Sequence, residues 1–150
     1  MVAIEHFNKI RERIGALIEE LSEEQLFAVP TGFRNTIAWN AAHLVVTQQI
    51  ILYGLSGLEL CIREEVVEAF RKGTGLEKVT PQLFWESMEF LEKAPIVLAE
   101  DYRNGRFRKF ETYTTSWGFV LNNIEEAIQF NNIHEGTHLG YMMAMRKSVG

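Results

Sequence analysis

The histidines His134 and His138 stand four residues apart near the end of the chain. On a helix this spacing places both imidazoles on one face, one turn apart. The same face, followed at heptad steps, carries Ala127, Asn131, Tyr141 and Met145. We expect this face to be buried, where an imidazole without a partner would cost about 1–3 kcal/mol. A metal ion would remove much of that cost, since neutral imidazole is a good ligand; the alternative is a pair of core histidines bonded to Asn, Thr or Tyr side chains.

The segment 134–138 reads H-E-G-T-H, which matches the H-E-x-x-H pattern of zinc proteases. A metzincin would continue with a glycine and a third histidine, but those positions hold Tyr141 and Ala144. A thermolysin-like site would need a further acidic residue downstream, and none follows Glu135. The protease interpretation therefore fails, and a third ligand must come from upstream.

His43 is the upstream candidate, because it lies in a segment without charged residues between Ile37 and Leu58. Such a segment is typical of a helix buried on several sides. Metal sites in helical bundles are built from facing helices. We therefore predict one metal site whose ligands are His43, His134 and His138. Polar residues on the matching helical faces are expected to support the imidazoles, namely Asn40, Thr47 and Asn131.

Two further residues near the histidines could take part in catalysis. Glu135 lies about 100° around the helix from His134, where it is either a general base for bound water or an exposed residue on the helix flank. We expect the exposed position. Tyr141 could reach an open coordination position. Cys61 has no basic neighbour in sequence and is expected to be an inert thiol, and His6 is expected at the surface.

Apolar periodicity predicts the elements that must position these residues. Long amphipathic or apolar helices are expected over residues 4–21, 36–54, 80–102 and 120–147, with Pro95 kinking or interrupting the third. Arg11 falls on the side of the first helix predicted to face solvent. A short turn is expected after Ser22, and a long, partly structured connection over 56–75, with a short helix at 64–70. The chain is thus predicted to be one all-α domain over residues 1–150.

Composition excludes several classes of protein. The net charge of −5 argues against nucleic-acid binding. No apolar run approaches the roughly 20 residues needed to cross a membrane, and we expect no signal peptide. The single Cys61 excludes an intrachain disulfide and fits a reducing compartment, so we expect a cytoplasmic protein.

The only basic cluster spans residues 103–110, around an Asn-Gly turn. We interpret it as a solvated turn anchored by Phe107 and Phe110. The alternative is a rim that attracts an anionic substrate. The residues that follow, 111–116, alternate enough to be extended.

The order and spacing of several residues resemble the DinB/YfiT-like superfamily over essentially the whole chain. The matching positions are Trp39, His43, His134, His138, Gly140 and Arg146. The resemblance implies a four-helix bundle of up-up-down-down type, often dimeric, with a divalent metal ion (Zn, Ni, Fe or Mn) held by three histidines. The chain departs from the family pattern at Tyr141, where the family commonly has Gln, so the hydrogen bond expected from that side chain is not carried over.

Three imidazoles leave at least one coordination position open, which is typical of a catalytic metal site. An ion there can activate water or hold a thiolate, and the resemblance implies either a thiol transferase or a hydrolase. We therefore expect a metal-dependent enzyme that acts on a small electrophile, with a low-molecular-weight thiol as one candidate substrate. The alternative is a non-catalytic, metal-binding or stress-associated module. The resemblance also predicts a homodimer, which is favoured by the aromatic residues Phe84, Trp85, Phe90, Trp117 and Phe119.

Overall fold

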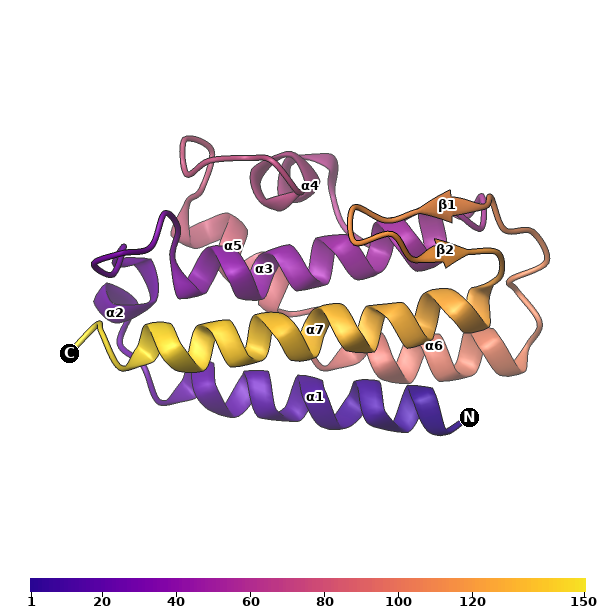
Figure 1. Ribbon diagram of the computed structural model, residues 1–150, viewed down its shortest axis with the longest axis horizontal. Helices are drawn as coiled ribbons and strands as arrows, with labels where there is room; N and C mark the ends of the chain where they lie inside the picture. Colours follow the sequence, from indigo (N-terminus) through magenta and orange to yellow (C-terminus); the bar gives the residue numbers. More distant parts are fainter.

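The computed structural model describes residues 1–150 and is predominantly helical (Figure 1). None of its helices combines the length and the apolar composition that crossing a bilayer requires. The elements in chain order are α1 (Val2–Glu19), α2 (Glu23–Phe27), α3 (Ile37–Gln48), the π-helical turn η1 (Gln49–Gly54), α4 (Glu64–Phe70), α5 (Pro81–Met88), α6 (Lys93–Arg103), β1 (Tyr113–Thr114), β2 (Val120–Leu121) and α7 (Ile124–Arg146).

Side-chain caps fix the starts of four helices. Ser22 forms a capping box with Gln25 at α2. Thr36 caps α3, and Thr80, followed by a proline, caps α5. α7 is capped by Asn123, so it begins a few residues later than predicted. The residues before it are not helical, because they pair as the second strand of a hairpin.

The predicted third helix is two helices, α5 and α6, so the helix is interrupted, as expected as an alternative to a kink, but the interruption lies before Pro95 and not at it. The chain leaves the helical path at 89–92, and Pro95 lies in the first turn of α6. The first four N–H groups of a helix have no intrahelical acceptor. A proline there loses no hydrogen bond, so it does not bend the helix.

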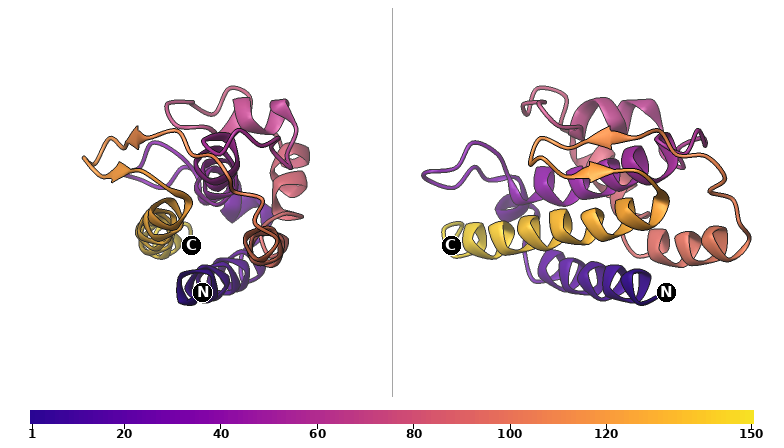
Figure 2. Two further views of the ribbon diagram at one scale, coloured as in Figure 1. Left: turned by 90° about the vertical axis from the view of Figure 1, so that its right-hand side faces the viewer. Right: turned by 45° about the vertical axis from the view of Figure 1, so that its right-hand side comes forward.

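Contacts between helices fix their directions. α1 and α7 are parallel, because the start of α1 contacts the first half of α7 and the ends of both helices contact each other, whereas the start of α3 contacts the end of α7. α6 runs in the same sense as α3 (Figures 1 and 2). The defining contacts are Ala3–Asn132, Glu20–Arg146 and Asn40–Met145.

The order along the chain is therefore up-down-down-up, which corrects the predicted up-up-down-down. The long connection joins the end of α3 to the start of α5 and crosses the molecule, so those helices run in the same sense. The first and last connections join helix ends that lie at the same end of the molecule. Two consecutive helices can run in the same direction only if a long connection crosses the molecule between them. The chain has one such connection, the one after α3.

α3 is the central helix, as predicted. Every residue of α3 except Thr47 is buried, and α3 packs against α2, α4, α5 and α7. The predicted short helix at 64–70 is confirmed as α4. The predicted extended segment includes β1, which pairs antiparallel with β2 in the register Tyr113–Leu121 and Thr114–Val120. The resulting hairpin lies beside the start of α7 (Figure 1).

Candidate metal centre

The fold brings together the three histidines predicted as ligands. His43 comes from α3, and His134 and His138 come from α7. One ring nitrogen from each lies within 4.8 Å of the other two. Since a zinc–imidazole bond is about 2.0–2.1 Å long, small side-chain rotations would bring all three nitrogens to one ion. The geometry can therefore hold a metal.

Hydrogen bonds fix two of the rings from behind. His43 Nδ1 lies 2.8 Å from the Phe70 carbonyl oxygen, and His138 Nδ1 lies 2.8 Å from Asn40 Oδ1. The Asn40 amide is oriented because its Nδ2 donates to the Thr36 carbonyl at 2.8 Å. Both histidines therefore face acceptors, which places the proton on Nδ1 and makes Nε2 the unprotonated nitrogen that can bind a metal ion. The structure thus places Asn40 behind an imidazole, as the sequence predicted.

His134 provides the observation that fits a metal most directly. Its buried Nδ1 has no hydrogen-bond partner. The ring is held only by aromatic neighbours, with Phe130 stacked at 6.1 Å and Trp117 tilted at 5.9 Å between ring centroids. A buried polar atom without a partner is costly. No protein group forms a hydrogen bond with Nδ1 of His134, so this imidazole fits the role of a metal ligand.

The protein environment keeps all three imidazoles neutral. Burial, together with the neighbouring imidazoles, lowers the pKa of His134 to about 3 and that of His138 to about 4. Burial also lowers the pKa of His43, against the opposing effect of its hydrogen bond to Phe70. Neutral imidazole is the form that binds a metal ion. At neutral pH no proton has to leave before the site can be loaded.

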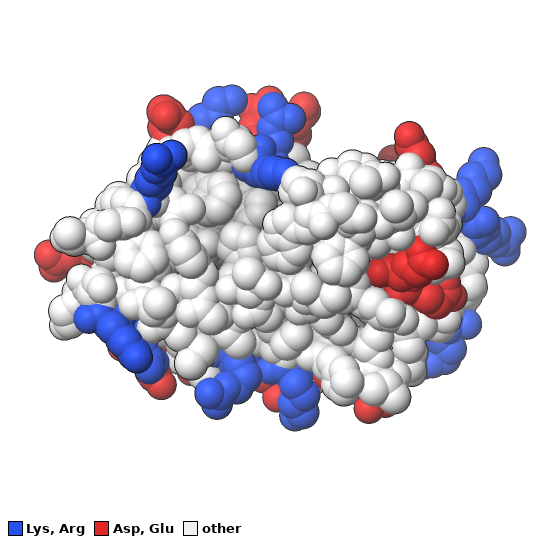
Figure 3. Space-filling model, in the orientation of Figure 1, with Lys and Arg blue, Asp and Glu red and all other residues white.

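A cavity of about 260 Å³ opens onto the three histidines. Its walls include four aromatic side chains, Trp39, Tyr113, Trp117 and Phe130. The ring of Trp39 is stacked on that of His43 with 4.6 Å between centroids. The surrounding face, formed by α3, α7 and the hairpin, carries few charged side chains, which gather at its rim (Figure 3). The arrangement therefore provides a largely neutral, aromatic chamber at the open side of the site.

Thr47 faces this cavity. It is the one residue of α3 that is not buried, and its hydroxyl lies 3.3 Å from His43 Nε2. The sequence predicted Thr47 as a support for the imidazoles. The structure puts it beside the prospective ligand atom, from where its hydroxyl can contact a molecule held in the cavity.

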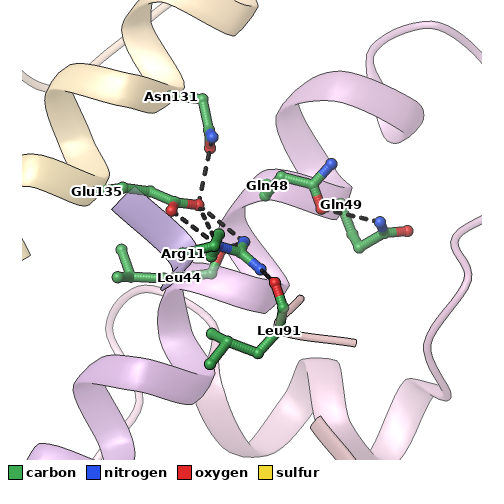
Figure 4. Close-up of polar contacts among 7 residues, drawn as sticks. All are labelled: Arg11, Leu44, Gln48, Gln49, Leu91, Asn131 and Glu135. Atoms are coloured by element: carbon green, nitrogen blue, oxygen red, sulfur yellow. Dashed lines mark hydrogen bonds and ion pairs between the residues drawn. The ribbon is translucent and has the colours of Figure 1, made fainter. Parts of the chain in front are cut away.

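The predicted exposed position of Glu135 is wrong. Its side chain is fully buried and accepts hydrogen bonds at 2.8 Å from Arg11 Nε and Nη2 (Figure 4). Arg11, predicted on the solvent side of α1, is also fully buried. The 100° turn between successive helix residues directs Glu135 toward α1 while His134 faces α3. Glu135 does not line the cavity, so the general-base interpretation finds no support in its position.

Asn131 belongs to the same buried network and does not contact the imidazoles. Its Nδ2 donates to Glu135 Oε1 at 3.3 Å. Arg11 completes the network by donating to the carbonyl oxygens of Leu91 at 2.8 Å and Leu44 at 3.3 Å (Figure 4). Burial raises the pKa of Glu135, while the Arg11 charge opposes this effect. The network links α1, α3, α7 and the segment before α6.

Tyr141 lies behind His138 and does not line the cavity. It is partly exposed, packs edge-on against Phe33 at 5.1 Å between centroids, and borders a smaller pocket with Asn40 and His138. The predicted reach of Tyr141 to an open coordination position is therefore not seen.

The other candidates lie outside the site. His6 is exposed, and neither it nor any residue of the basic cluster 103–110 lines the cavity. Partial burial raises the pKa of the Cys61 thiol, which disfavours the reactive thiolate. Sequence reasoning missed Lys72, which does line the cavity. It follows α4 in a loop, where no periodicity relates it to the histidines.

Comparison with protein families agrees with this geometry. A family model described as the DinB superfamily matches residues 6–142, a span that contains His43, His134 and His138. No curated protein matches the chain.

Proposed function

The chain belongs to the DinB superfamily, and on this premise we propose that it is an enzyme that uses one divalent metal ion to act on a small electrophile. His43, His134 and His138 would hold the ion. One observation carries the proposal: three neutral imidazoles, with no fourth protein ligand beside them, converge on a solvent-open cavity. An open position of this kind distinguishes catalytic from structural metal sites.

Different residues of the chain would orient the ligands and line the cavity of such a site. The Phe70 carbonyl and Asn40 hold two rings in the orientation that exposes Nε2. The aromatic walls limit the access of water, which strengthens electrostatic interactions inside the cavity. When bound, the ion would supply Lewis acidity, suited to generating either a thiolate or a hydroxide nucleophile at neutral pH. Both thiol transfer and hydrolysis are compatible with this donor set.

The proposal is tested by turnover in the metal-loaded protein. Zn(II)-, Ni(II)- and Mn(II)-loaded samples are assayed with cellular thiols against chlorodinitrobenzene and epoxide acceptors, and separately for hydrolysis of ester substrates. We expect metal-dependent turnover with at least one pair, which falls to background in His138→Ala because a ligand is lost. His6→Ala is the matched control, since it removes an exposed histidine outside the site, and it should retain full activity.

Metal binding without turnover would favour the second candidate function, a non-catalytic metal-binding module. If the wild-type protein binds one ion per chain at the three histidines and yet turns over none of these substrates, the enzyme proposal is contradicted. A non-catalytic metal-binding module would then be the better description.

The four-helix bundle implied by the family is included in the proposal. Four axes result if α3 is taken with η1 and if α5 and α6 are counted as one interrupted helix. The pair of facing helices that carries the histidines is then α3 and α7, which matches the way bundles build metal sites in their interior.

The homodimer stays a prediction. Of the aromatic residues that favoured it, Phe84 is fully buried within the chain, whereas Trp85, Trp117 and Phe119 keep 43–47% of their surface exposed. Trp117 and Phe119 lie in the turn that joins β1 to β2, and this hairpin forms part of the weakly charged face described above. If two copies associate, this face offers the larger aromatic surface.

A further inference from the structure

Lys72 is the only charged residue on the walls of the cavity, and no acidic residue lines it. The side chain is exposed and has no carboxylate partner, whereas Lys78 in the same connection pairs with Glu68 at 3.1 Å. Its ammonium lies near enough to the histidines to contribute to the lowered pKa of His43 and of His134. A cation therefore borders the cavity without an internal counter-ion.

The rest of the lining is neutral and divides into two kinds. Aromatic rings from α3, α7 and the hairpin supply apolar surface, while Thr47, Thr115 and Ser116 supply hydroxyl groups. The imidazoles add no charge while they are neutral. Although the whole chain carries a net charge of −5, the one charge on the cavity lining is therefore positive, and low-dielectric walls strengthen its attraction for an anion.

We propose that Lys72 binds an anionic oxygen group of the substrate while the aromatic walls hold its apolar part. The substrate class is then a small organic anion with an aromatic or other apolar body. The cavity volume of about 260 Å³ lies just below the usual range of about 300–1,000 Å³ for ligand pockets, which favours a small molecule. This assignment rests on the proposed function, because it takes the histidine cavity as the substrate site.

The position of Lys72 makes the interaction specific to charge. An ammonium is a point donor that contacts a carboxylate or phosphate oxygen without requiring one geometry. Arginine should therefore replace it, while glutamine should not. Since Lys72 lies in a loop at the surface, neither substitution disturbs the core.

The test compares phenylacetate with phenylacetamide, which have the same shape but differ in charge. Binding is followed by NMR through the indole N–H signals of Trp39 and Trp117, which line the cavity, with Trp85 outside it as an internal reference. We expect phenylacetate to shift the first two signals and to bind about fivefold more tightly than phenylacetamide, as one partly solvated charge pair allows. The preference should vanish in Lys72→Gln and persist in Lys72→Arg and in the control Lys78→Gln.

The measurement is made on zinc-free and zinc-loaded protein, with zinc stoichiometry determined separately. A Lys72-dependent preference in the zinc-free protein supports the proposal independently of the ion. Failure of zinc to bind would contradict the proposed function alone. Equal affinities for the two probes, or a preference that Lys72→Gln leaves unchanged, would overturn the assignment of Lys72 whether or not zinc binds.

Discussion

Replacing Arg11 with methionine, or Glu135 with leucine, is expected to lower the free energy of unfolding by about 3–5 kcal/mol. Each single change leaves the other charge buried without its partner, since both side chains are fully buried. In a chain of this size the loss corresponds to a fall in Tm of roughly 6–20 °C. Urea unfolding followed by circular dichroism gives the free energy for each variant.

The double variant Arg11→Met/Glu135→Leu separates this cause from a simple loss of packing. Apolar replacement of a whole buried ion pair is often neutral, so the double variant should be more stable than either single variant. The carbonyl oxygens of Leu91 and Leu44 lose their Arg11 donor in Arg11→Met and in the double variant alike, so that cost cancels when these two variants are compared. A single-variant loss below about 1 kcal/mol would show that the buried pair does not form as described.

Zinc is expected to stabilise the wild-type protein but not His43→Ala. An ion that binds only the folded state adds about 2.7 kcal/mol when its concentration is 100 times its Kd. This corresponds to a rise in Tm of roughly 5–10 °C. Removal of His43 takes away the only ligand from α3, so the zinc-dependent rise should disappear. Thermal melts with zinc and with a chelator measure the difference within each variant, which cancels any change in metal-free stability.

The exposed His6 again supplies the control for this experiment. His6→Ala should show the full zinc-dependent rise, because its side chain is not part of the cluster. An equal rise in wild type and in His43→Ala would place the stabilising zinc elsewhere on the chain.

The convergence of the histidines was predictable because two independent signals agreed. The spacing of His134 and His138 indicated one inward helix face, and the absence of charge around His43 indicated a buried helix. A central helix and a buried face of the last helix have to meet in a chain with one core. Local sequence patterns were therefore sufficient to predict the three ligands. They were also sufficient to predict the supporting role of Asn40, which lies one helical turn from His43.

The supporting residues were less predictable, because their partners are distant in sequence. Arg11 and Glu135 are 124 positions apart, and a charged residue on an amphipathic helix is ordinarily read as solvent-exposed. Only the packing of α1 against α7 shows that these two charges satisfy each other. Lys72 and the hairpin reach the cavity through loops, for which periodicity predicts no direction.

Two helix starts were predictable from their capping residues, whereas the start of α7 was predicted too early although Asn123 caps it. Thr36 and Thr80 cap helices at the predicted positions. The interruption before α6 carries no Gly or capping signal, and the break predicted from Pro95 was placed a few residues too late in the chain. Chain direction was wrong because it came from the family resemblance, whereas the lengths of the connections determine it here.

Anomalous diffraction from a crystal grown with zinc shows whether the three histidines hold one ion. The account predicts one anomalous peak per chain at the zinc edge, about 2.0–2.1 Å from one nitrogen each of His43, His134 and His138. The peak should face the cavity and have at least one non-protein ligand. A saturating zinc concentration that yields no peak at these nitrogens, or a peak completed by a fourth protein side chain, would contradict an open three-histidine metal centre.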